Sequence, residues 1–125
     1  MDYYFYKNIV YRIYCKFELL EFDFFKNNIC SQKDYIIKMS VLSELIGYKR
    51  PHYVLIDKRN NDFTMNNKLY EFNRNLLKRS NIDYGVKNIF ILVPNNKYAI
   101  CRRLNLIDTM VFKHFESIIE YIGNR

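Results

Sequence analysis

A carboxylate and a guanidinium stand two residues apart where a short apolar run ends, in the stretch YVLIDKR that contains Asp57 and Arg59. If that run is a strand that continues, alternation places both side chains on one side of it. Ligands bind at such strand ends in open α/β sheets. Asn60 and Thr64 follow in a polar loop and complete the candidate binding residues of this region. The structural alternative is that Asp57 pairs with Arg59 or accepts backbone N–H bonds in the turn. We favour this alternative, since one carboxylate and one cation do not make a reaction mechanism.

Other side chains that could do chemistry lack the spacing for it. His52 and His114 are far apart and outside any metal-ligand pattern, and a chain with three glycines contains no phosphate-binding loop. No nucleophile elbow occurs. Thr64 is expected to cap a helix and not to accept phosphate. We therefore predict no catalytic residue, no phosphorylation site, no metal and no cofactor, in a protein that is not an enzyme.

Cysteine usage and charge indicate a cytoplasmic protein. Cys15, Cys30 and Cys101 are odd in number, form no Cys-x-x-Cys pair and have apolar neighbours, so we expect buried, reduced thiols. The first residues lack the basic and apolar regions of a signal peptide, and no apolar run approaches the roughly 18 residues that span a bilayer. The net charge is +7, but the basic residues are scattered, which favours a mixed surface over nucleic-acid binding.

Predicted strands and helices alternate along the chain, which is typical of one α/β domain over residues 1–125. An opening hairpin is followed by strands at 53–56, 86–93 and 109–112, of which the first two should be central and adjacent. Helices should begin near Ser31, Thr64, Asn95 and Lys113. The prediction is a mixed sheet of about five strands with four helices, and ELLEFDFFKNN could extend a strand or start a helix. The period of two in the hairpin places one set of side chains on the buried face: Ile9, Tyr11, Ile13, Cys15 and Phe17.

Four segments carry a family resemblance: NIVYRI at 8–13, PHYVLIDKR at 51–59, NIFILVPNNKYAI at 88–100 and VFKHFESIIEYI at 111–122. Their order and motifs resemble the SpoIIAA-like, or STAS-like, domains, and most closely the small stand-alone members from Bacteroidetes. The resemblance implies a STAS-like fold. Anti-sigma antagonists of this family carry a serine after the third strand that becomes phosphorylated, but the matching segment here, DKRNNDFTMNN, contains no serine. Lys113 and His114 replace the usual Ser-Thr before the last helix, so that helix should lack its side-chain cap.

Aromatic side chains crowd the first quarter of a chain that has 12 Tyr and 10 Phe. One domain cannot bury all of them, and exposed Tyr and Phe are enriched at interfaces. A biased gene composition that places Tyr on ordinary surface is the other explanation. We take Tyr4 and Phe24 as candidate contacts.

The predicted function is a non-enzymatic, protein-binding or regulatory STAS-like module, whose partner is another protein or a second copy, giving a homodimer. The alternative is a small-ligand or lipid carrier with a pocket at the strand ends near Asp57.

Overall fold

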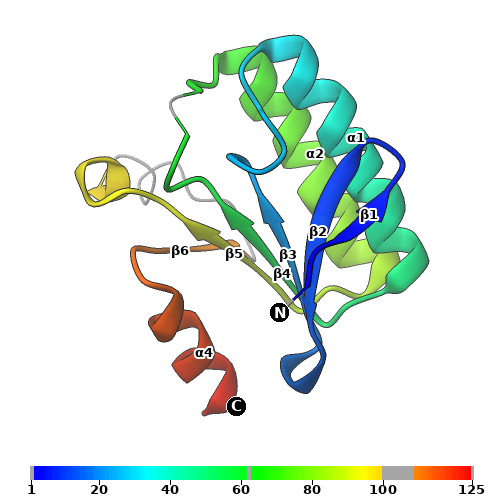
Figure 1. The fold of residues 1–125 in the computed structure, drawn as a ribbon, viewed down its shortest axis with the longest axis vertical. Helices are drawn as coiled ribbons and strands as arrows, with labels where there is room; N and C mark the ends of the chain where they lie inside the picture. Colours follow the sequence, from blue (N-terminus) through cyan, green and yellow to red (C-terminus); the bar gives the residue numbers. More distant parts are fainter. Residues whose placement is uncertain (1, 62, 100–108, 125) are drawn as a thin grey trace.

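The computed structural model describes residues 2–61, 63–99 and 109–124, which form an α/β fold around one mixed sheet (Figure 1). Its six strands lie side by side in the order of the chain, with the first three antiparallel and the last four parallel. The strands are β1 (Tyr4–Tyr6), β2 (Ile9–Tyr14), β3 (Leu19–Asp23), β4 (Tyr53–Asp57), β5 (Asn88–Leu92) and β6 (Thr109–Phe112). The predicted adjacency of β4 and β5 is confirmed. The strand beyond the predicted five is β3, which lies in the stretch that the sequence left open.

The described helices cover both faces of the sheet. They are α1 (Gln32–Lys49), α2 (Asn67–Tyr84) and α4 (Phe115–Gly123). Helices α1 and α2 lie side by side over one face, and α4 lies over the other (Figure 1). The helix predicted from Asn95 starts with a 3-10 turn, Asn95–Lys97, and residues 98–99 are helical; the rest of that prediction lies outside the described residues.

The ends of α1 and α4 follow from local sequence. The Ser31 hydroxyl accepts from the Asp34 backbone N at 3.1 Å, which satisfies one of the free N–H groups at the start of α1. The helix ends at Arg50, whose φ of 50° is left-handed. Helix α4 begins after His114, which makes no side-chain capping bond, as the sequence predicted.

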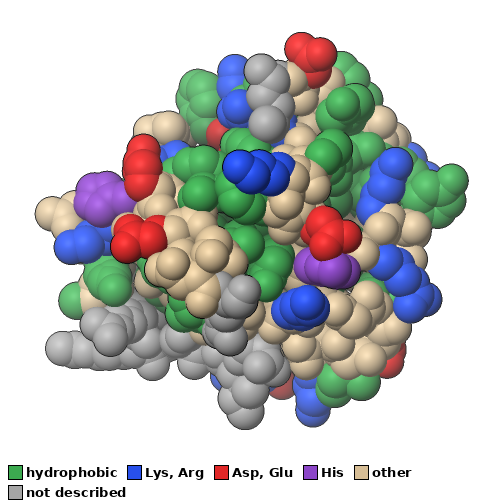
Figure 2. All heavy atoms as spheres, turned by 90° about the horizontal axis from the view of Figure 1, so that it is seen from below, with side chains coloured by type: hydrophobic (Ala, Val, Ile, Leu, Met, Phe, Trp, Pro, Cys, Tyr) green, Lys and Arg blue, Asp and Glu red, His purple; other side chains and the backbone are tan. Residues whose placement is uncertain are grey.

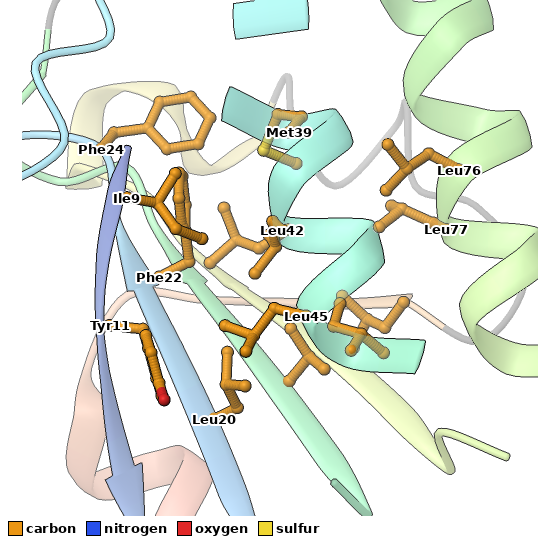
Figure 3. Close-up of a cluster of buried hydrophobic side chains, with 14 of the residues drawn as sticks. Ile9, Tyr11, Leu20, Phe22, Phe24, Met39, Leu42, Leu45, Leu76 and Leu77 are labelled. Atoms are coloured by element: carbon orange, nitrogen blue, oxygen red, sulfur yellow. The ribbon is translucent and has the colours of Figure 1, made fainter. Parts of the chain in front are cut away.

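The larger core lies between the sheet and helices α1 and α2 (Figure 3). Strands β2, β3, β4 and β5 supply alternate side chains to it, and α1 adds a fully buried stripe that includes Tyr35, Met39 and Leu42. The Tyr35 hydroxyl donates to Asn73 Oδ1 at 2.6 Å and so joins the two helices. A smaller core on the opposite face packs Phe90 and Leu92 against Ile118 of α4.

The predicted buried set of the hairpin is correct only for its first part. Ile9 and Tyr11 are buried, but β2 ends at Tyr14 and a 3-10 turn, Cys15–Phe17, follows. The turn breaks the period of two, so Cys15 is exposed and Phe17 packs against the smaller core on the other face. The prediction of buried thiols is therefore wrong for Cys15, and also for Cys30, which is exposed just before α1. Cys101 lies outside the described residues.

Candidate functional site

Asp57 and Arg59 form a closed local pair at the carboxyl end of β4. Asp57 Oδ1 accepts from the Arg59 backbone N at 3.0 Å and from its Nε at 3.1 Å, while Oδ2 lies 2.9 Å from the second guanidinium nitrogen. The Asp57 side chain is only 7% exposed, whereas Arg59 is 37% exposed. The hydrogen bond to Asp57 raises the pKa of Arg59. Asp57 thus pairs with Arg59 and accepts a backbone N–H bond in the turn, as the structural alternative in the sequence analysis proposed. A role in ligand binding for this pair, or for the exposed Asn60, stays a prediction.

A second ion pair lies on the same face of the sheet, one strand away. Arg12 of β2 is the register partner of Glu21 of β3, and Arg12 Nε lies 3.0 Å from Glu21 Oε2. The Tyr14 hydroxyl donates to Glu21 Oε1 at 3.1 Å. Burial raises the pKa of Glu21, although Arg12 opposes part of that rise. Burial also raises the pKa of Tyr14 to about 12. Sequence reasoning missed this pair because Glu21 lies in the stretch whose secondary structure was ambiguous.

The carboxylates near these strand ends are engaged by local donors. Asp23 Oδ1 accepts from the backbone N of Phe25 at 2.8 Å, in the turn that follows β3. Glu21 and Asp57 each face an arginine. Among the described residues, no group of three or more His, Cys, Asp or Glu side chains is arranged to hold a metal ion. The Arg12–Glu21 pair joins β2 to β3, while the Asp57–Arg59 pair closes the turn that follows β4.

Thr64 does not cap α2, which corrects the prediction from the sequence. The capping residue is Asn66, whose Oδ1 accepts from the Leu69 backbone N at 3.0 Å, and α2 begins at Asn67. The preceding loop is held by the Asn61 side chain, which accepts from the Phe63 backbone N at 2.9 Å. The Phe63 ring stacks on Tyr35 of the core, 5.7 Å between centroids. With Phe63 packed on the core, the helix begins later in the chain than predicted, and Asn66 is its capping residue instead of Thr64. Asparagine is at least as good a capping residue as threonine.

Phe24 is not a surface residue, which corrects the second aromatic candidate. It is 1% exposed, and its ring meets those of Phe22 and Tyr35 edge-on at 5.9 Å each. Figure 3 shows it beside Ile9 at one end of the larger core. The chain keeps the alternation of β3 for one residue beyond the strand, so residue 24 turns to the same face as residue 22.

Exposed aromatic rings do occur on β1, at the edge of the sheet. Tyr4 is 50% exposed and Phe5 is 77% exposed, and we call these two side chains the edge aromatics. They point to opposite faces, because Tyr4 is paired with Tyr11, which faces the larger core, and Phe5 with Val10. Phe25 is also exposed, at 58%, but lies outside the strands. The sequence did not single out Phe5, although its position in the first strand of the hairpin was a usable signal.

The tip of the hairpin is fastened to α1. Glu44 Oε1 accepts from the Tyr6 hydroxyl at 2.8 Å and from Lys7 Nζ at 2.6 Å. These two bonds lower the pKa of Glu44. Lys7 takes the left-handed turn position with a φ of 51°. The edge strand is thus fastened to α1 at its tip, while the edge aromatics lie exposed on its two faces.

Basic, acidic and hydrophobic side chains are interspersed over the face shown in Figure 2. None of the described helices is both long enough and apolar enough to cross a membrane. Comparison of the chain with family models, with curated proteins and with solved structures found no match.

Proposed function

We propose that the chain is a cytosolic STAS-like module that binds a protein partner through β1 and performs no catalysis of its own. The STAS-like assignment is supported by the four motif segments of the sequence. The observation that carries the binding proposal is the pair of edge aromatics, Tyr4 and Phe5, half or more exposed on a strand with only one neighbour in the sheet. Free thiols at Cys15 and Cys30 favour a reducing compartment.

Strand addition is the mode of contact that this edge favours. The outer side of β1 presents backbone N–H and C=O groups that pair with no other described strand. An added strand would take main-chain hydrogen bonds from it, and side chains on both of its faces would meet Tyr4 and Phe5. Covering one exposed ring contributes roughly 1–2 kcal/mol through lost apolar area.

Charge favours a partner other than a second copy. The chain carries a net charge of +7, so two copies repel each other, while an acidic protein is attracted. The homodimer remains the other outcome of the test. The carboxylates near the strand ends are engaged by arginine or backbone donors, which favours a binding role over an enzymatic one.

The test compares three variants of the full chain in a pull-down from native lysate and in sedimentation equilibrium. Phe5→Ser should weaken association by roughly tenfold or more, about 1.4 kcal/mol. Phe25→Ser is the matched control, because it removes another exposed phenylalanine ring, outside the strands, and it should change little. Asp57→Asn should also leave association nearly unchanged. A loss confined to Asp57→Asn, or a strictly monomeric chain that retains no partner, would contradict the proposal.

The alternative function, a small-ligand carrier, is favoured by a cavity, but this cavity does not lie at the strand ends near Asp57 where the sequence predicted it. A pocket near Asp57 stays a prediction. A cavity of about 450 Å³ lies instead between α1 and α2, and Asp57 is not among its lining residues.

A further inference from the structure

The cavity between α1 and α2 is an open groove with a buried floor. Ser43 of α1 and Leu76 of α2 form the floor and are 5% and 7% exposed. Glu44, Asn75 and Arg79 stand at its exposed rim. A volume of about 450 Å³ is within the range of pockets that hold small molecules.

The groove exists because α1 presents small residues where α2 presents large ones. Ser40, Ser43 and Gly47 follow each other at helical spacing along α1. At the closed end the Tyr84 ring lies on Gly47 so tightly that a Cβ at residue 47 would come within 2.8 Å of Tyr84 Cζ. The Phe72 ring forms part of the α2 wall. The walls therefore offer two aromatic surfaces to the body of a ligand.

Some donors of the groove have no hydrogen-bond partner within the described part of the chain, although the Ser40 hydroxyl donates to the Ile36 carbonyl at 2.7 Å. The Ser43 hydroxyl makes no hydrogen bond with any described residue, although the side chain is more than nine-tenths buried and lines the groove. The Asn75 amide and the Arg79 guanidinium likewise have no partner within the described part of the chain. Among the described residues, the buried side-chain atoms without a hydrogen-bond partner are Arg12 Nε and Glu21 Oε2, so the Ser43 oxygen is open to the groove and can reach a ligand there.

Glu44 is the carboxylate among the described lining residues of the groove, and its charge is paired with a lysine of the hairpin, which does not line the groove. Glu44 accepts from Lys7 Nζ at 2.6 Å and from the Tyr6 hydroxyl at 2.8 Å, and both donors belong to the hairpin. The positive charge of Arg79 is therefore left unbalanced within the groove. Arginine binds carboxylates and phosphates through its planar fork of N–H donors.

We propose that this groove binds a small organic anion. Arg79 holds the acid group, Ser43 and Asn75 add hydrogen bonds to it, and the Phe72 and Tyr84 rings cover an apolar body. This site lies on the helices and is joined to the hairpin through the bonds of Glu44 to Tyr6 and Lys7. The Phe5→Ser and Arg79→Gln variants leave those bonds intact, so they test the two proposals separately.

The experiment titrates the isotopically labelled full chain by 1H–15N NMR with phenyl phosphate, inorganic phosphate and phenol. Phenyl phosphate combines both features of the proposed ligand, and the other two probes carry one feature each. We expect saturable shifts at residues 40–44 and 72–79 with phenyl phosphate, and weaker binding of phosphate and phenol at the same residues. Arg79→Gln should weaken phenyl phosphate binding by roughly tenfold or more.

Two further variants separate the site from general effects. Arg74→Gln is the matched control, because Arg74 is an exposed arginine of α2 that pairs with Glu71 at 3.5 Å and does not line the groove. It should bind phenyl phosphate as the unchanged chain does. Ser43→Ala removes only the buried hydroxyl and should weaken binding while the chain stays folded. The proposal is overturned if no probe gives saturable shifts, if the shifts lie elsewhere, if Arg79→Gln behaves like Arg74→Gln, or if phosphate or phenol binds as tightly as phenyl phosphate.

Discussion

Replacing Arg12 by Met should expose the cost of the buried charge on Glu21. The change removes the guanidinium that lies 3.0 Å from Glu21 Oε2 and keeps a side chain of similar length. Glu21 is 6% exposed at its side chain, so water reaches its carboxylate poorly once the guanidinium is removed. The variant therefore isolates the penalty for an unpaired carboxylate within β3.

The expected loss follows from the burial of the two partners. Removing one partner of a fully buried ion pair costs about 3–5 kcal/mol. Arg12 is 27% exposed and is partly hydrated already, so we expect the low end, about 3 kcal/mol at neutral pH. The double variant Arg12→Met with Glu21→Gln removes both charges and keeps an oxygen for the Tyr14 hydroxyl. It should lose about 1 kcal/mol, much of it from the contact of Arg12 with the Tyr3 ring at 4.3 Å.

The pH dependence gives an independent check. Burial raises the pKa of Glu21 above its ordinary 4.5, so the folded chain binds this proton more tightly than the unfolded chain does. The contribution of Glu21 to the free energy of unfolding therefore falls as pH rises from 4.5 through the raised pKa. Without Arg12 the pKa of Glu21 rises further. The destabilisation of Arg12→Met should thus be largest near about pH 7 and shrink as the solution is acidified toward about pH 5.

Urea unfolding followed by far-ultraviolet circular dichroism measures all four corners of the cycle at both pH values. Glu21→Gln alone supplies the remaining corner. A loss below about 0.5 kcal/mol in Arg12→Met, or an equal loss in the double variant, would refute the reasoning. A destabilisation that grows on acidification would refute the assignment to an unpaired Glu21 carboxylate.

Three further predictions concern the corrected positions. Phe24→Ala should lower the free energy of unfolding by about 3–5 kcal/mol in urea titrations, because it empties a closely packed site in the larger core. Asn66→Ala should cost about 1 kcal/mol by the same measurement, because it removes the hydrogen bond that caps α2. The thiols of Cys15 and Cys30 should react with a disulfide reagent in the folded chain without denaturant, since both are exposed; protection of both in the native state would contradict the structure.

The α/β class and the main elements could be predicted because they rest on local patterns. Ser31 caps α1 as its spacing with Asp34 indicated, and the run at 53–56 is buried on both faces as its composition required. The closed Asp57–Arg59 pair was also foreseeable, since residues two apart in a turn after a strand are within reach of each other.

The predictions for Thr64 and Phe24 were wrong because contacts between residues far apart in the sequence changed what the local pattern indicated. Phe63 packs on Tyr35 and shifts the start of α2, so the cap falls on Asn66. Phe24 is covered because Tyr35 of α1 reaches its ring, which no count of aromatics near the amino terminus could show.

The sequence by itself indicated most of the strands and helices, since hydrophobic period and capping residues act within a few positions, but it left β3 open and placed the start of α2 too early. Only the tertiary structure decided which polar side chains face each other, because that depends on register and on the packing of helices. Glu21 meets Arg12 through the antiparallel register of β2 and β3. The groove between α1 and α2 likewise sets Ser43 opposite Arg79 from positions far apart in the chain. Burial then changes the chemistry of such groups, since the Glu21 carboxylate would have no raised pKa if it were in water.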